Sequence, residues 1–167
     1  MPIPLRDADH SLYREKKEAV MSIAYNLGVE VYIFANELRR LCKKFGLNFP
    51  GMFVQAWHET DGFKSDAWRY KKNPAGIKTK TGKTYQKYVN GIDAARAFVV
   101  HMLAYVEPEG NGTVVKDYLY LDERFAVAVK ANRGKNFATF HDLAGAWAED
   151  TEYGEWVERR WAELFKS

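Results

Sequence analysis

The sequence predicts a mainly α-helical (α+β) globule with a small β-hairpin lobe following its third helix. Two observations predict this fold. Apolar residues recur at helical spacing along most of the 167 residues, between residues that typically begin and end helices. One segment, residues 75–89, alternates instead around Thr81-Gly82, as a short hairpin does. No linker or repeat divides the chain, so we expect a single domain over residues 1–167, with the β-lobe at about 64–89.

The first three helices are expected before residue 62. Ser11 can cap a helix over 12–27, which Gly28 closes. A second helix covers 29–45 and ends at Gly46. A third carries MFVQAWHET behind Pro50, a residue suited to the first turn of a helix. Residues 63–74, between this helix and the hairpin, are predicted to be a loop.

The rest of the chain is again predicted to be helical. Asn90 can cap a helix over 92–106, and the glycine-containing run EPEGNG ends it. One or two shorter helices are expected within 116–132. Two more, over 137–150 and 153–165, close the chain.

Composition excludes several classes of protein. With 47% hydrophobic and 15% aromatic residues, the chain can bury a core and is not disordered. No apolar run approaches the roughly 20 residues that a membrane helix needs. The start, MPIPLRDADH, does not read as a secretory signal, so we expect synthesis in the cytoplasm and release or secretion by another route. The single cysteine, Cys42, is expected to be a buried thiol.

The charge is distributed unevenly along the chain. The net charge is +3, yet residues 64–87 hold eight basic side chains and a single acidic one, Asp66. We call residues 64–87 the basic segment. Such a concentration of positive charge indicates an anionic partner, either an acidic polymer or a nucleic acid.

Glu59 is the principal candidate for chemistry. On a helix that turns by about 100° per residue, Ala56 and Trp57 share the arc that faces the core, and Glu59 falls at its flank. Asp61 falls on the other side, so the two carboxylates are not a pair. A carboxyl beside aromatic rings has a raised pKa and can protonate a leaving oxygen. The alternative is an ordinary helix-end glutamate in solvent.

The residues around Glu59 resemble a known family. QAWHETDGF, then NPAGIK, then Lys87-Tyr88 before a helix are similar to the signature of bacterial peptidoglycan-cleaving β-N-acetylglucosaminidases, glycoside hydrolase family 73, in the lysozyme-like superfamily. AGAWAEDTEYGEWV resembles the closing stretch of that family, so the resemblance covers about residue 50 to the end. It implies a lysozyme-like fold and Glu59 as the catalytic acid. The chain departs from the pattern because no glutamate occurs between Glu59 and Glu107, where family members often carry a second one.

The remaining site residues are expected on the same stretch. Asp66, in the loop, and Asp150, in the closing motif, are the candidates for a second catalytic carboxylate. A substrate 2-acetamido oxygen or 6-hydroxyl could replace that carboxylate as the attacking group. The resemblance, together with the capacity of aromatic rings to stack on sugars, predicts the following substrate-binding residues: Gln55, Trp68, Asn73, Gly76, Ile77, Lys78, Tyr88 and Trp147.

The resulting expectation is an endo-β-N-acetylglucosaminidase that acts on peptidoglycan as a monomer, in the manner of a phage-type endolysin. No cofactor, nucleic-acid partner or membrane partner is expected. No metal is expected either, because the four histidines are scattered: His10, His58, His101 and His141. Three alternatives remain: a muramidase or lytic transglycosylase on the same fold, a glycan-binding domain without activity, and a single-strand nucleic-acid binder that uses the rings and charges of WRYKK.

Overall fold

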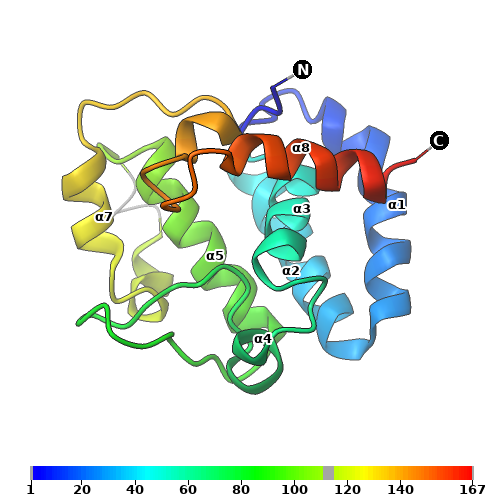
Figure 1. Ribbon diagram of the computed structural model, residues 1–167, viewed down its shortest axis with the longest axis horizontal. Helices are drawn as coiled ribbons and strands as arrows, with labels where there is room; N and C mark the ends of the chain where they lie inside the picture. The colour runs from blue at the N-terminus through cyan, green and yellow to red at the C-terminus, as the bar shows by residue number, and fades with distance from the viewer. Residues whose placement is uncertain (1, 111–114, 167) are drawn as a thin grey trace.

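A computed structural model of the chain describes residues 2–110 and 115–166, and the regular structure within these ranges is entirely helical (Figure 1). No described helix is long and apolar enough to cross a membrane. The elements are seven α-helices and two short 3-10 helices: α1 (Ser11–Leu27), α2 (Val29–Phe45), α3 (Phe49–Glu59), α4 (Asp66–Lys71), α5 (Gly91–Val106), η1 (Lys116–Leu121), α7 (Phe125–Asn132), η2 (Phe140–Leu143) and α8 (Tyr153–Leu164).

Helix α3 packs against α1, α2 and α8. α1 lies against α2 and α3, α8 crosses over α3, and α5 packs on α2 and carries α7 on another side (Figure 1). Every residue from Phe49 to Ala56 is buried, as expected for a helix that is apolar on all faces. Glu59, the last residue of α3, therefore follows a helix that is buried on all its faces up to Ala56.

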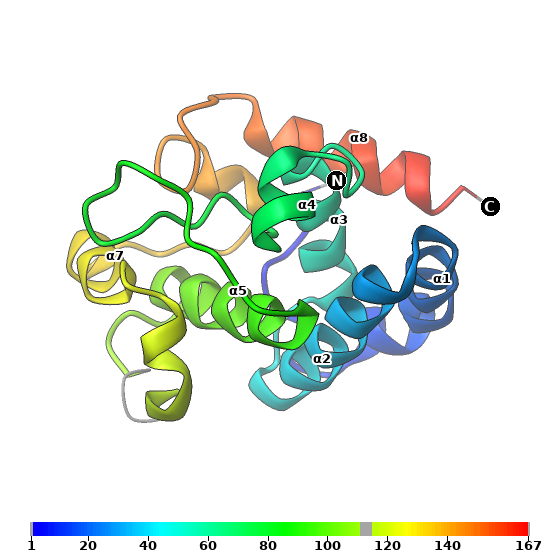
Figure 2. The same ribbon diagram turned by 90° about the horizontal axis from the view of Figure 1, so that it is seen from below.

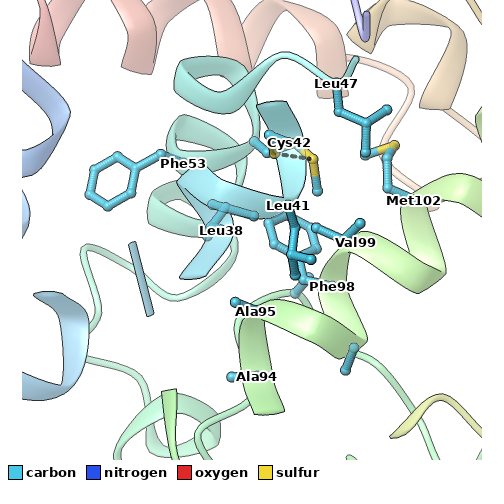
Figure 3. Close-up of a cluster of buried hydrophobic side chains, with 14 of the residues drawn as sticks. Leu38, Leu41, Cys42, Leu47, Phe53, Ala94, Ala95, Phe98, Val99 and Met102 are labelled. Carbon is cyan, nitrogen blue, oxygen red and sulfur yellow. Dashed lines mark hydrogen bonds between the residues drawn. The ribbon is translucent and has the colours of Figure 1, made fainter. Parts of the chain in front are cut away.

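The core between α2 and α5 is built from closely packed aliphatic and aromatic side chains. Figure 3 shows Leu38 and Cys42 of α2 together with Phe98 and Val99 of α5, all of them at most 1% exposed. The Cys42 thiol lies 3.6 Å from the sulfur of Met52, and burial raises the pKa of this thiol. Cys42 is thus the buried thiol that the sequence predicts, and it is chemically inert in this position.

Polar side chains cap the starts of α1 and α5, and the cap of α1 is not the residue that the sequence predicts. Asn90 accepts a hydrogen bond from the backbone N–H of Asp93 (2.9 Å), which confirms its predicted role. Ser11 does not cap α1 but lies inside it. The carboxylate of Asp7 takes that role instead, accepting hydrogen bonds from the backbone N–H groups of residues 12 and 13 (3.1 and 2.8 Å).

The predicted β-hairpin lobe is wrong, because the described part of the chain contains no strand. Residues 75–89 form an irregular loop in which one antiparallel bridge joins Lys78 to Tyr85. One backbone hydrogen bond on either side of this bridge completes the pairing, from Thr79 to Thr84 (2.9 Å) and from residue 86 to Ile77 (2.8 Å). Most side chains at the tip of the loop are exposed, so its arms have no apolar face that a sheet could bury.

Two further segments differ from the prediction. Residues 63–74 are not only loop, because Ser65 begins the short helix α4 by accepting a hydrogen bond from the N–H of Trp68 (3.3 Å). Residues 137–150 form only η2, followed by turns that include Gly145 in the left-handed region (φ 79°). The consequence of the second difference is that Trp147 lies in a turn rather than on a helix.

Candidate active site

Glu59 lies where the buried helix α3 reaches the surface. Its side chain is partly exposed, whereas the preceding residues of the helix up to Ala56 are buried. Thr60 ends the helix, with its hydroxyl donating to the carbonyl of Ala56 (2.7 Å) and accepting from the N–H of Phe63 (2.9 Å). These bonds fix the turn after Glu59, so the carboxyl has a defined position between core and solvent.

Two residues from the C-terminal part of the chain lie at the Glu59 carboxyl. The hydroxyl of Tyr153, the first residue of α8, donates to Oε1 of Glu59 over 2.8 Å. Trp147, a second donor, lies near enough to the same carboxyl to favour its ionised form, but the contact does not reach full hydrogen-bond geometry. Burial raises the pKa of Glu59 to about 6, against the opposing effect of these two donors, which favour the ionised form. At neutral pH a useful fraction of this carboxyl therefore carries a proton.

Tyr153 is fixed as a hydrogen-bond donor. It is 1% exposed, and burial together with the nearby Glu59 raises the pKa of its phenol well above the ordinary value. Gln55, one turn before Glu59 on α3, lies close enough to this phenol to lower its pKa in part. The contact does not reach full hydrogen-bond geometry, however, and both polar atoms of the buried Gln55 amide lack a partner among the described residues. Gln55 thus supplies unused hydrogen-bonding capacity behind the acid.

Replacing Tyr153 with phenylalanine is expected to raise the pKa of Glu59 further, by up to about one unit, because a hydrogen bond to a charged group is lost and the ring is kept. The measurement is a carboxyl titration of both proteins by NMR. Tyr120, an exposed tyrosine on η1, provides the matched control in Tyr120→Phe. An unchanged Glu59 pKa in Tyr153→Phe would contradict the role assigned to the phenol.

A pocket of about 420 Å³ adjoins the site at Trp147. The indole packs against the rings of Phe98, His101 and Tyr105, with centroid distances of 6.0, 4.9 and 4.9 Å. Its lining residues come from α5, α7, the 75–89 loop and the segment before α8. Figures 1 and 2 show α7, this loop and this segment at the same end of the molecule. Gly76 and Lys78, two of the predicted substrate-binding residues, line this pocket together with Trp147.

The two predicted partner carboxylates are not joined to Glu59. Asp150 is exposed and accepts a hydrogen bond from the backbone N–H of Glu152 (2.8 Å), in the turn that leads into α8. Asp66 is exposed in the first turn of α4, where a negative charge stabilises the helix start. Neither side chain hydrogen-bonds to Glu59, Tyr153 or Trp147 in the described ranges. In the described ranges the structure therefore shows no carboxyl hydrogen-bonded to Glu59, and another carboxyl, that of Glu149, lines the pocket beside Trp147.

Two of the predicted sugar-stacking rings are inside the protein. Trp68 is 3% exposed, and its ring lies 5.0 Å from Phe63 and 5.4 Å from Phe34. Tyr88 is also 3% exposed, and its hydroxyl donates to the carbonyl of Leu121 (2.9 Å). Neither ring offers a free face on which a sugar could stack. Both rings instead anchor the ends of the basic segment on the core.

Asn73, Gly76 and Ile77 organise the loop beside the pocket. The fully buried Asn73 amide donates to the carbonyls of Ile77 (2.7 Å) and Gln86 (2.9 Å). Its oxygen accepts from the N–H groups of Ala75 (3.2 Å) and Ile77 (3.0 Å). Gly76 lies in the left-handed region (φ 66°), and Ile77 is 2% exposed. Asn73 and Ile77 thus shape the pocket wall from inside, and Lys78 is exposed beside it.

Sequence reasoning missed three residues of this region. Tyr153 lies in the closing motif AGAWAEDTEYGEWV, but the sequence analysis predicted no function for it. His101 and Asp122 form a close pair on the pocket side, with His101 Nδ1 2.7 Å from Asp122 Oδ2. The two residues are 21 positions apart in the sequence and gave no sequence signal, because only the packing of α5 against the segment after η1 brings them together.

Comparison of the chain with protein families, with curated proteins and with solved structures finds no match. Within residues 2–110 and 115–166, no group of three or more His, Cys, Asp or Glu side chains could hold a metal ion. Chemically, the site offers the Glu59 carboxyl, whose pKa is about 6, and the Tyr153 hydroxyl, which donates to it. Trp147 lies beside this carboxyl and forms an aromatic wall of the adjoining pocket.

Proposed function

We propose that this chain is a lysozyme-like glycoside hydrolase that cleaves a β-1,4 bond of peptidoglycan, as an endo-β-N-acetylglucosaminidase with Glu59 as its general acid. One observation carries the proposal: the Glu59 carboxyl, at the end of a buried helix, accepts a hydrogen bond from the Tyr153 hydroxyl that orients it, and its pKa is raised to about 6. A general acid needs a pKa near the working pH and a fixed direction for its proton. The resemblance of QAWHETDGF and NPAGIK to the glucosaminidase signature supports the same role.

The chemistry proposed for Glu59 is protonation of the glycosidic oxygen. The bond from this oxygen to the anomeric carbon breaks as the oxygen takes the proton of Glu59, and the carboxyl becomes a carboxylate. Asp66 and Asp150 are both exposed and Asp66 lies in the first turn of α4, so we propose that the 2-acetamido oxygen of the substrate, rather than a second carboxylate, attacks the anomeric carbon. Water then opens the resulting ring, returns a proton to Glu59 and leaves a free reducing end.

The basic segment supports an anionic substrate. Six of its cations are exposed, and one of them, Lys78, lines the pocket: Lys64, Arg69, Lys78, Lys80, Lys83 and Lys87. Peptidoglycan carries stem-peptide carboxylates, which exposed cations would attract with an affinity that falls as salt is added. These cations would supply affinity for the wall rather than selectivity for one bond.

A glycan-binding domain without activity is the second candidate. It is favoured by the absence of a second carboxylate bonded to the site among the described residues. In that case the raised pKa of Glu59 would be a by-product of burial. The two candidates differ in whether new sugar ends appear when the protein meets its glycan.

The test is digestion of purified peptidoglycan with the wild type and with Glu59→Gln, followed by borohydride reduction and mass spectrometry. Reduced N-acetylglucosamine ends that are absent with the variant are the expected result. Reduced muramic acid ends would identify a muramidase, and anhydro-sugars would identify a transglycosylase. Binding of the glycan without any new ends would replace the hydrolase proposal with the binding-domain candidate.

A further inference from the structure

The His101–Asp122 pair is built into the wall of the pocket beside Trp147. His101 lies on α5, with its side chain 13% exposed, and the Asp122 side chain is fully buried. Nδ1 of His101 is 2.7 Å from Oδ2 of Asp122. The other carboxylate oxygen of Asp122 accepts from the backbone N–H of Arg124 (3.1 Å), so both oxygens are engaged. A buried pair with this geometry holds the imidazole in one orientation.

The pair also determines which ring nitrogen carries the proton. A carboxylate only accepts hydrogen bonds, so Nδ1 of His101 must be the donor in the contact with Asp122. In a neutral imidazole the proton on Nδ1 leaves Nε2 with a free lone pair. Among the described residues no group hydrogen-bonds to Nε2, and His101 lines the pocket. In this neutral form, Nε2 of His101 is a fixed hydrogen-bond acceptor in the wall of the pocket that no described residue uses.

The other walls of the pocket indicate what would meet this acceptor. The hydroxyl of Tyr105 is already used, because it lies 3.4 Å from the carbonyl of Ala146 and donates to it. Trp147 gives an aromatic wall, and small apolar side chains of α7, Ala128 and Ala131, give a shallow apolar surface. The charged side chains of Lys78, Arg124 and Glu149 complete the lining. A ligand that fits these features has an apolar face and several hydroxyl or amide groups, one of which donates to His101.

We propose that His101 is a ligand-contacting residue, whose Nε2 accepts a hydrogen bond from a hydroxyl or acetamido N–H of an N-acetylated sugar bound in this pocket. This inference rests on the proposed function for the class of ligand. It goes beyond that function because it assigns specificity to a histidine and a buried aspartate that lie away from Glu59 in the sequence. Asp122 acts through His101 and is a positioning residue.

The test uses the full chain carrying Glu59→Gln, so that a β-1,4-linked tetramer of N-acetylglucosamine can bind without being cut. Nitrogen NMR of the histidine rings is expected to show His101 with its proton on Nδ1 in the free protein. Addition of the tetramer is expected to shift the Nε2 resonance, as an accepted hydrogen bond does. A purely structural histidine would show no such shift.

Two substitutions in the same background separate contact from folding. His101→Phe keeps a ring against Trp147 and removes the acceptor. Asp122→Asn lets the asparagine amide donate to Nδ1, which moves the imidazole proton to Nε2. Each is expected to weaken tetramer binding about tenfold, the equivalent of one well-made hydrogen bond to a ligand. Asp117→Asn removes an exposed charge from the nearby η1 and is expected to bind like the background protein.

The inference is overturned if the tetramer leaves the His101 resonances unchanged or does not bind, if Nε2 carries the proton in the free protein, or if both variants keep full affinity. Its failure is distinguishable from that of the hydrolase proposal. Tetramer binding through His101 without peptidoglycan cleavage by the wild type would refute the hydrolase and leave this contact standing. If the wild type cleaves peptidoglycan but the tetramer leaves the His101 resonances unchanged, the hydrolase proposal stands and the His101 contact is refuted.

Discussion

Replacing Glu59 with glutamine is expected to lower kcat/KM for peptidoglycan by roughly 10²–10⁴, the usual contribution of a general acid. Glutamine keeps the size of the side chain and can still accept the hydrogen bond from Tyr153, so the loss reports on the proton alone. The measurement is release of soluble fragments from purified walls. Asp61→Asn, which removes an exposed carboxylate two residues away, is the control and is expected to keep activity.

The pH dependence of the wild type follows from the same carboxyl. Glu59 must be protonated to act, and its pKa is raised to about 6, so kcat/KM is expected to fall about tenfold per pH unit above that value. In the unfolded chain the pKa is near the ordinary 4.5. Between these values the folded state holds the proton more tightly, so stability present below pH 4.5 is lost as pH rises through 6.

The loss amounts to about 2 kcal/mol in the free energy of unfolding, and Glu59→Gln is expected to remove this pH dependence. Denaturant unfolding at pH 4.5 and pH 8 measures it in both proteins. Full lytic activity in Glu59→Gln, or an equal stability change with pH in variant and wild type, would refute Glu59 as a buried acid.

The second large effect is expected on stability, from Asn73→Ala. Asn73 is fully buried, and its amide makes four hydrogen bonds to the backbone of the 75–89 loop. Alanine would leave two carbonyls and two N–H groups without these partners, at a cost on the order of 3 kcal/mol. For a chain of this length the melting temperature is expected to fall by roughly 6–12 °C. Differential scanning calorimetry measures the change.

Two companion variants make the Asn73 result specific. Asn73→Asp keeps the accepting oxygen but sets a buried carboxylate oxygen against the carbonyls of Ile77 and Gln86, so we expect a loss at least as large as that of Asn73→Ala at neutral pH. Asn26→Ala, at an exposed position on α1, is expected to change stability by less than about 0.5 kcal/mol. If Asn73→Ala has the same melting temperature as Asn26→Ala, the Asn73 amide does not stabilise the 75–89 loop.

The helices were predictable because their signals are local. The spacing of apolar residues and the flanking glycines predicted α2 as observed, Val29–Phe45 with Gly46 directly after it. Asn90 predicted the start of α5. The hairpin prediction failed for a physical reason that alternation alone does not contain. A two-stranded ribbon needs an apolar face packed on something, and the 75–89 loop has few side chains to bury. Its shape comes from the Asn73 amide instead.

For the site, the sequence by itself determined that Glu59 ends an apolar helix, and helical geometry separated it from Asp61. That placement depends only on neighbours within a few residues. Only the tertiary structure decided that the Tyr153 hydroxyl holds the carboxyl, that Trp68 and Tyr88 are buried, and that His101 contacts Asp122. Each of those contacts joins segments far apart in the chain, and burial and long-range hydrogen bonds exist only after the helices have packed together.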